Sequence, residues 1–278
     1  MPSRGRLKKS RSATPFTTEE IKLAPSKSSP SSAPGPDGVP YAVWKKVIFV
    51  NPAIILALLS PLVAFGYQPP FLKTANGVFL DKPGEACYGS PASFRIIFLL
   101  KTILNFLERV MTSRLSALAR SKGLLDPNQR GSLPGLSSPD ACLTLTHEIK
   151  TLQTPRLEIS TLFLDIKAGF DNVNACTLRA RLLASRVPSY MVDWVSSFLS
   201  ERTCTLVFQG SPNISSPVSV GTPQGSPIPP LLFLLYVDLL HISVPRGLIV
   251  SYIDDFSITV ASPSTEATYA DYKISSPP

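Results

Sequence analysis

The chain has 278 residues, of which 44% are hydrophobic and 17% charged, enough apolar material for one or two globular domains with a sizeable core. Lysine and arginine outnumber aspartate and glutamate by 27 to 19, which gives a formal net charge of +8. Such a basic excess favours a polyanionic partner, either nucleic acid or an anionic membrane surface. The two histidines and four cysteines show no zinc-ligand or CxxC spacing, so a histidine triad, a zinc centre and a disulfide framework are all disfavoured.

Residues 1–34 are rich in serine, proline and basic side chains, and they hold too little apolar surface to fold alone. We expect them to be mostly disordered, with room for a short helix at Thr17–Leu23 behind an acidic capping pattern. The five basic residues at the start are followed by no apolar stretch, which argues against a secretory signal. A solvated tail is favoured over a nuclear or organellar address.

Folded sequence is expected from Gly35, with a first helix at Tyr41–Phe49. Val47–Phe65 is about 19 largely apolar residues long, near the minimum for a membrane-spanning helix. Because Pro52 and Pro61 interrupt this stretch, two buried helices broken at the prolines are favoured over a membrane anchor.

The rest of the chain alternates between helical and strand patterns. Helices are predicted over Phe94–Leu118, Asp140–Leu152, Cys176–Leu183, Tyr190–Leu199 and Leu231–Leu240. Strands are predicted over Ile159–Ile166, Thr203–Phe208, Val218–Val220 and, as a pair, within Gly247–Val260. This mixture indicates an α+β fold in which helices back a sheet.

Two adjacent carboxylates, Asp254 and Asp255, stand between apolar strands in Ser251–Phe256 (SYIDDF). Like charges at a tight turn repel one another, so a bound cation is a better reason for them than folding. Oxygen ligands select magnesium or manganese, the ions that phosphoryl transfer requires. The alternative is an ordinary solvated turn.

A third acid, Asp165, ends the apolar strand Leu162–Ile166. If that strand lies beside the hairpin, Asp165 faces Asp254 and Asp255 across the sheet. Three carboxylates could then bridge two metal ions about 3.5–4 Å apart, as in a standard two-metal site.

Gly221–Pro227 (GTPQGSP) lies between these acids in the sequence. Gly225 permits close backbone approach of a ligand, and Gln224 offers an amide to a base, sugar or phosphate. The alternative is a surface loop that leads into the following helix.

The order and spacing of these three segments resemble the reverse transcriptase domain of non-LTR (LINE-type) retrotransposons, particularly those of fungi. The resemblance implies that Asp165 binds metal and that Phe170, five residues later, crowds a ribose 2′-hydroxyl. Tyr252–Asp255 matches the Tyr-x-Asp-Asp motif, which places Tyr252 at the substrate. Gly221–Phe233 resembles the second palm motif, whose glutamine lies under the incoming nucleotide.

Upstream segments extend the resemblance over about residues 16–264. Ala33–Trp44 is similar to the opening segment of this domain, and Gln129–Gly135 to its glutamine–glycine finger segment. Val78–Gly84 and Ser93–Leu100 resemble the finger segments that handle triphosphate and template. Their Lys82 and Arg95 become candidate phosphate contacts, with simple solvated charge as the alternative.

The pattern departs from the family at Ile96, at the Ala168-Gly169 order and at Pro229. After Val260 we find no lysine-bearing palm loop, primer-grip hairpin or thumb, and no endonuclease precedes the domain. We therefore expect a fragment or a decayed copy of a longer retroelement polyprotein.

The resemblance implies a right-hand polymerase with an antiparallel palm sheet and a missing thumb. Fingers would occupy residues 35–155, the palm 156–262 and an unstructured tail 263–278. The reaction would be RNA-directed DNA synthesis with magnesium or manganese, an RNA template, a DNA primer and dNTPs. Asp165 and Asp254 would be the primary metal ligands and Asp255 a less direct one. The nucleus is the expected location and the mitochondrion an open one; a truncated remnant that only binds nucleic acid is the alternative function.

Overall fold

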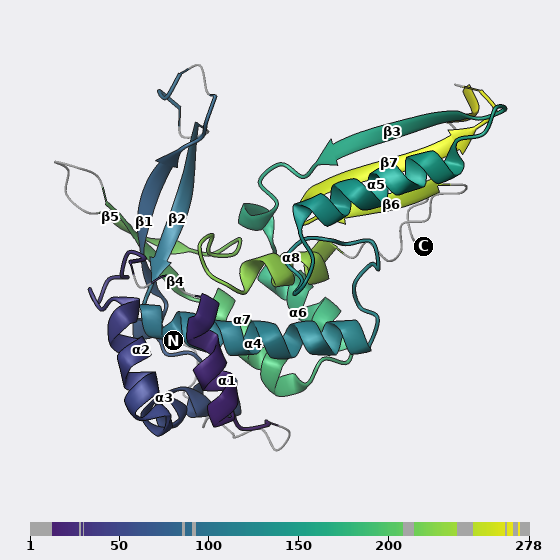
Figure 1. The fold of residues 1–278 in the computed structure, drawn as a ribbon. Helices are drawn as coiled ribbons and strands as arrows, with labels where there is room; N and C mark the ends of the chain where they lie inside the picture. The colour runs from purple at the N-terminus through teal and green to yellow at the C-terminus, as the bar shows by residue number, and fades with distance from the viewer. Residues whose placement is uncertain are drawn as a thin grey trace. The chain divides into compact units, whose positions relative to one another are not determined.

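The computed structural model of the chain describes residues 13–27, 29, 31–84, 87–90, 93–207, 214–237, 247–264, 266–268 and 272 (Figure 1). The chain divides into two compact units, each assembled from two separate stretches. The first comprises Met1–Leu115 and Phe170–Pro229, and the second comprises Ser116–Gly169 and Pro230–Pro278. These units do not follow the consecutive blocks 35–155 and 156–262, because strands distant in sequence pair within each unit.

The first unit contains a four-stranded sheet in the order β2-β1-β4-β5. β1 (Thr74–Asp81) pairs antiparallel with β2 (Phe94–Leu100) and parallel with β4 (Arg202–Leu206). β4 in turn pairs antiparallel with β5 (Ile214–Val218), so the strand expected at Val218–Val220 lies earlier than predicted. Phe208 of the other expected strand lies outside the described residues.

The helix expected from Phe94 was predicted wrongly at its start. Phe94–Leu100 forms β2, and helix α4 (Thr102–Ser121) begins only after it. This segment is a run of aromatic and branched residues with a single charge, which suits a strand paired with β1 better than an amphipathic helix. From Leu104 onward the expected three- and four-residue spacing holds, and Leu107 and Met111 are buried.

The helices of the first unit enclose an aromatic core. They are α1 (Thr18–Leu23), α2 (Tyr41–Val50), α3 (Pro52–Ala64), α6 (Ala175–Ala184) and α7 (Ser189–Leu199), with short 3-10 turns η1 (Ala24–Lys27), η2 (Pro70–Leu72) and η4 (Phe170–Asn172). Trp194 and Phe198 of α7 stack with ring centroids 5.4 Å apart, and both are fully buried with Phe106 of α4. The expected helices at residues 41–49, 176–183 and 190–199 are confirmed.

The short helix expected at Thr17–Leu23 is confirmed, whereas the disorder expected for the rest of residues 1–34 is wrong at Ala24–Lys27, which form a 3-10 turn. The α1 helix forms behind a capping box between Thr17 and Glu20, as its sequence predicts, and it buries Ile21. Arg114 of α4 makes a two-pronged ion pair with Glu20, both bonds at 2.7 Å, and lies over the ring of Phe16. This arginine supplies the stabilising contacts that the segment lacks by itself.

The apolar stretch Val47–Phe65 is broken at Asn51, as expected, but Pro61 lies inside α3 and does not end it. Across the described ranges, no single helix has the length and hydropathy to cross a bilayer, and the α2–α3 pair that reaches them together is bent by 111°. The expectation that both helices are buried is wrong for one side: Phe49 is 87% exposed and Ile54 49%.

The second unit contains an antiparallel sheet in the order β3-β7-β6, with bounds Glu158–Asp165, Asp255–Ser262 and Gly247–Tyr252. Figure 1 shows α5 (Ser138–Leu152) lying along β6 and β7, and α8 (Pro229–Val237) completes the unit. The predicted helix at residues 140–152, the strand at 159–166 and the pair within 247–260 are confirmed. The end of the predicted helix at residues 231–240, residues 238–240, lies outside the described residues.

The tail expected to be unstructured from residue 263 is partly built into this unit. Residues 266–268 are helical, and Thr268 is only 6% exposed. Tyr272 packs against the buried cluster of Ile249, Ile258 and Val260, and its hydroxyl donates to the carbonyl of Ile258 at 3.5 Å. The aromatic ring closes an apolar surface of the sheet that would otherwise face water.

Candidate functional site

The β3–β7 register sets Asp165 directly opposite Asp255. Asp165 is the last residue of β3 and Asp255 the first of β7, so the two carboxylates leave the sheet at the same end and on the same face. Opposed residues of antiparallel strands have Cβ atoms about 4.5–5.5 Å apart, close enough for two carboxylates to repel. Both residues are exposed, which leaves the pair open to a cation from solvent.

Asp254 lies in the two-residue turn between Tyr252 and Asp255, which are themselves a register pair. Its backbone carbonyl accepts the Ile166 N–H at 3.3 Å, which ties the turn to the end of β3. The strand therefore does lie beside the hairpin, as the sequence suggested. Asp255, and not Asp254, occupies the position across from Asp165.

The donor chemistry of these three acids fits a hard divalent cation, since carboxylate oxygens are the ligands that magnesium and calcium prefer. Among the described residues, however, no three His, Cys, Asp or Glu side chains are spaced closely enough to hold a metal ion together. The structure thus shows an opposed pair of carboxylates with the third acid adjacent in the turn.

A hollow of about 400 Å³ lies beside the carboxylate pair within the second unit. Its walls include Ala141, Cys142 and Leu145 of α5 together with Asp165 and Asp255. Most of its lining is apolar, so the acids stand at the edge of a hydrophobic surface.

A second group of candidate residues lies in the first unit, around the loop Gly221–Ser226. The amide of Thr222 donates to the carbonyl of Phe170 at 2.8 Å, and the amide of Gly221 donates to that of Val173 at 3.0 Å. The Gln224 side-chain amide donates to the Asp171 carboxylate at 3.0 Å. These bonds bring Phe170 and Gln224 together, two of the residues that the sequence singled out.

Gly221 and Gly225 are required by the path of this loop, since both have positive φ, +75° and +104°. A Cβ atom at Gly221 would meet the Asp171 carbonyl oxygen at 2.6 Å, and one at Gly225 would meet the Ile97 side chain at 2.9 Å. The Gln224 carbonyl also accepts the Phe98 amide of β2 at 2.7 Å. The loop is therefore fixed against the sheet and does not hang free at the surface.

Glu108 lies under the same loop and is completely buried. The Ser226 hydroxyl donates to one oxygen of its carboxyl group, while the other oxygen has no partner among the described residues. Burial raises the pKa of Glu108 to about 8, with the Ser226 hydrogen bond and Arg109 acting in the opposite direction. The residue is therefore mostly protonated at neutral pH.

Arg202 braces the other end of the loop. Its guanidinium donates to the carbonyls of Val220 at 3.0 Å and Gly221 at 2.6 Å, and to that of Leu199 at 3.2 Å. Burial lowers the pKa of Arg202 to about 10. Three backbone carbonyls thus hold a buried cation beside the glycine that the loop requires.

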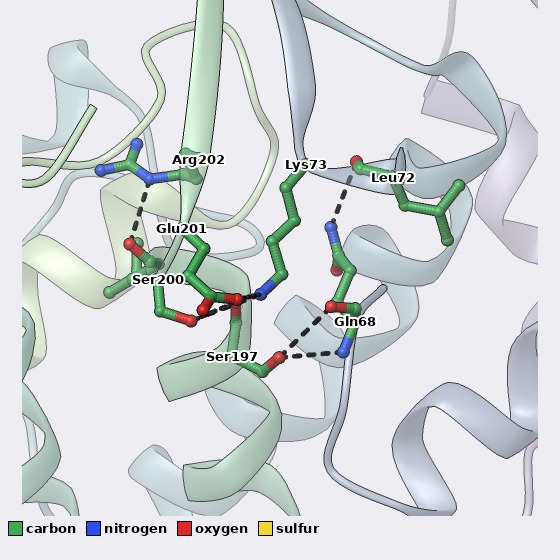
Figure 2. Close-up of polar contacts among 8 residues, drawn as sticks. Gln68, Leu72, Lys73, Ser197, Ser200, Glu201 and Arg202 are labelled. Carbon is green, nitrogen blue, oxygen red and sulfur yellow. Dashed lines mark hydrogen bonds and ion pairs between the residues drawn. The ribbon is translucent and has the colours of Figure 1, made fainter. Parts of the chain in front are cut away.

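Figure 2 shows a neighbouring network around Lys73, whose side chain is 1% exposed. Its Nζ donates to the Ser200 hydroxyl at 3.3 Å and lies 3.8 Å from the Glu201 carboxylate. Burial lowers the pKa of Lys73, and the largely exposed Glu201 offsets this only in part. The network joins the start of β1 to the end of α7 and positions β4 next to β1.

Arg95 and Lys82 come together at the far end of the β1–β2 hairpin. Arg95 opposes Leu80 in the register, and the Lys82 amide donates to the Ser93 carbonyl at 2.9 Å. Arg95 is exposed and Lys82 half-buried. Both cations thus extend from one short stretch of a hairpin in the first unit.

Three residues that hold the loop Gly221–Ser226 in place were not identified from the sequence: Asp171, Glu108 and Arg202. Asp171 directly follows Phe170, which the sequence had singled out, so its position was a usable signal. Glu108 carried a weaker signal, an acid one residue after the buried Leu107 in an amphipathic helix. Nothing in the local sequence of Arg202 marks it as buried.

An α+β chain with opposed carboxylates at the turn end of an antiparallel sheet is consistent with a reverse transcriptase domain. The family model described as reverse transcriptase (RNA-dependent DNA polymerase) matches residues 80–273, and the chain belongs to this family.

Three relatives support the same assignment. The chain is 26% identical over 253 residues to a probable RNA-directed DNA polymerase from transposon X-element of Drosophila melanogaster, and 27% over 256 residues to that from transposon BS. It is 28% identical over 230 residues to the Pol polyprotein from the type-2 retrotransposable element R2DM. The alignments cover 90%, 89% and 81% of this chain but only 28%, 28% and 20% of these relatives. The resemblance to non-LTR retrotransposon polymerases is confirmed; the narrower likeness to fungal elements stays a prediction.

Proposed function

We propose that this chain carries the catalytic region of an RNA-directed DNA polymerase of a retroelement. The observation that carries the proposal is the register pair of Asp165 and Asp255 at the hairpin turn of a reverse transcriptase family member. Such a pair destabilises the sheet by repulsion. A reaction that needs negative charge at the β6–β7 turn would explain why the pair lies there.

The opposed carboxylates of Asp165 and Asp255, with Asp254 adjacent to them in the turn, would hold divalent magnesium, or manganese in its place. Bound there, such ions would neutralise negative charge on the phosphate oxygens of an incoming nucleotide and its primer. The carboxylates would contribute the negative charge and the oxygen ligands. Tyr252 precedes the turn and borders the hollow beside the carboxylates.

The first unit would supply contacts to the nucleotide. Gln224 is fixed through its backbone carbonyl and its side-chain amide. It would present the loop to the base and sugar of the nucleotide, and Gly225 would let the nucleotide approach the backbone closely. Phe170 would discriminate against a ribose 2′-hydroxyl. Arg95 and Lys82 would contact phosphates, for which the planar guanidinium of Arg95 is the better match.

In this proposal the sheet β3-β7-β6 is the palm, and the β1–β2 hairpin belongs to the fingers. The partners are an RNA template, a DNA primer and dNTPs, and the basic excess of the chain favours their phosphate backbones. We propose the nucleus as the location of the reaction, because integration into chromosomal DNA would take place there, with the mitochondrion as the alternative.

The test is primer extension on poly(rA)/oligo(dT) with Mg²⁺ or Mn²⁺, using the full chain and an Asp254→Ala variant. Asp193→Asn serves as a matched control, because it removes one carboxylate charge from an exposed ion pair with Arg179. We expect incorporation by the wild type and the control, and loss of at least about a hundredfold in Asp254→Ala.

Equal incorporation by the wild type and Asp254→Ala would contradict the proposal. Binding of RNA–DNA duplex that depends on salt but is unchanged by Asp254→Ala and by chelation would then identify a non-catalytic nucleic-acid-binding remnant.

A further inference from the structure

The turn that carries Asp254 is held in a strained conformation. Ile253 has φ of +62°, in the left-handed region. Among the described residues, four other non-glycine residues have positive φ, and none of them is β-branched. A branched side chain in this region is rare and strained, so the surrounding structure has to impose it.

The contact that imposes the left-handed conformation on Ile253 comes from Gln129, a residue of the same unit that is 2% exposed. Its side-chain oxygen Oε1 accepts two backbone amides, that of Ile253 at 3.0 Å and that of Gly131 at 2.7 Å. The N–H of the strained residue is thereby fixed to a point outside its own hairpin.

The backbone around Gln129 is itself attached to β6. The Arg130 amide donates to the Ser251 carbonyl at 2.8 Å, and the Ser251 amide donates to the Asn128 carbonyl at 3.3 Å. Residues 128–130 thus run parallel to the last residues of β6 as a short added bridge. The glutamine is therefore positioned by main-chain bonds and does not depend on a flexible loop.

Gly131 provides the room for this contact. A Cβ atom there would lie 2.6 Å from the Ile253 amide nitrogen and 2.5 Å from its Cγ1 atom. Since real Cβ contacts essentially never approach so closely, any other residue would push the turn away from Gln129.

The other end of the Gln129 amide is left without a partner. Its Nε2 atom is buried and makes no hydrogen bond within the described part of the chain. Leaving a buried donor unsatisfied destabilises the folded protein, so folding stability alone does not explain a glutamine at this position. A carboxylate would supply the same acceptor, but it would add a fourth negative charge near Asp165, Asp254 and Asp255.

We propose that Gln129 is a positioning residue for the acidic turn: its carbonyl oxygen holds Ile253 in the left-handed conformation and so directs the Asp254 and Asp255 carboxylates. The role of those carboxylates rests on the proposed function, whereas the contact that positions them does not. Gln129 acts through the backbone amide of Ile253.

The experiment measures Mn²⁺ binding to the full chain by the loss of the free-ion electron paramagnetic resonance signal, and exchange of the Ile253 amide by NMR. Four variants are compared with the wild type: Gln129→Met, Ile253→Gly, the double variant and Asp254→Ala. Gln129→Met keeps the size of the side chain and removes the acceptor. We expect it to weaken Mn²⁺ binding about tenfold and to speed Ile253 amide exchange at least tenfold.

Adding Ile253→Gly to Gln129→Met should restore most of the Mn²⁺ affinity, because glycine adopts positive φ without strain. A merely structural glutamine would lower the thermal unfolding midpoint of Gln129→Met without this rescue. Unchanged amide exchange in a folded Gln129→Met variant overturns the inference, as does unchanged Mn²⁺ affinity when the wild type binds.

The two proposals fail in different ways. Wild-type Mn²⁺ binding no tighter than that of Asp254→Ala contradicts the proposed metal site, and amide exchange then still decides the role of Gln129. Wild-type binding that Asp254→Ala abolishes and Gln129→Met leaves intact supports the metal site and removes the positioning role.

Discussion

Asp165 and Asp255 face each other across neighbouring antiparallel strands, one ending β3 and the other beginning β7. No cationic side chain forms an ion pair with either of them among the described residues. The sheet therefore carries two carboxylates that repel each other at the end where the β6–β7 turn lies. The proposed chemistry depends on the negative charge of this pair.

Replacing one member of this pair should stabilise the protein while removing the site. Asp255→Asn keeps the shape of the side chain and relieves the repulsion, so we expect a gain of about 0.5 kcal/mol in unfolding free energy in the presence of chelator. Excess Mg²⁺ should stabilise the wild type and not the variant, because only the wild type gains ligand binding. Denaturant unfolding with EDTA and with Mg²⁺ measures both; a variant less stable than the wild type in EDTA would show that repulsion is not the dominant interaction.

The buried Glu108 should make the first unit less stable as pH rises. Its folded-state pKa of about 8 lies above the ordinary value of 4.5, so the folded state binds the proton more tightly. The stabilisation is complete below about pH 4.5 and is lost as pH rises towards 8, a change of a few kcal/mol over that window.

Glu108→Gln cannot ionise, and it keeps an oxygen that accepts the Ser226 hydroxyl. The unfolding free energy of the wild type should fall between pH 5 and 8. We expect that of Glu108→Gln to change much less over the same range. Chemical denaturation at several pH values measures this, and parallel pH profiles for the two proteins would argue against a buried neutral Glu108.

Gly221 should tolerate alanine far less well than Gly38. Both have positive φ, +75° and +66°, but a Cβ atom at Gly221 meets the Asp171 backbone, while one at Gly38 meets nothing within 4 Å. Gly38→Ala should cost about 1 kcal/mol for the left-handed conformation alone. Gly221→Ala should cost about 3 kcal/mol and weaken dNTP binding, because the loop that holds Gln224 has to move. Equal destabilisation of the two variants would mean that the loop yields freely.

Lys73 should be replaceable by an apolar side chain of its own length. Its Nζ is buried, with one hydroxyl bond and one long ion pair to a largely exposed Glu201. Lys73→Met removes the buried charge and leaves Glu201 in water, so we expect a change in unfolding free energy within about 1 kcal/mol, of either sign. Lys73→Ala removes the packed side chain as well and should cost about 2–3 kcal/mol. Thermal unfolding distinguishes the two, and an equally large loss in both would show that the charge itself stabilises the unit.

Strand and helix positions were largely predictable where local pattern and burial agree. The branched residues of β3 and the paired strands around Asp254 could be recognised, since short apolar runs rich in branched residues and bounded by turn residues are typical of strands. The Thr17–Glu20 capping box was readable for the same reason. The prediction failed at Phe94–Leu100, where an apolar run fits either structure and only pairing with β1 decides between them.

The acids of the candidate site were found from sequence, and Asp165 was expected to face Asp254 and Asp255, but the exact register, which sets Asp165 opposite Asp255, was not predicted. A shift of one residue would move every side chain to the opposite face, and local sequence does not fix that shift. Glu108 and Arg202, which hold the loop Gly221–Ser226 in place, were missed because both lie far from that loop in the sequence. Their burial follows from packing between distant elements.

The sequence by itself determined the α+β class, the order of the motifs and the residue types that can bind metal and phosphate. These are properties of short segments, governed by local spacing and side-chain chemistry. Only the tertiary structure decided that the N-terminal segment packs through Arg114, that Gln129 reaches the amide of Ile253, and that the two units interleave along the chain. Each of these depends on contacts between residues far apart in sequence, whose free energy appears only when the chain is folded.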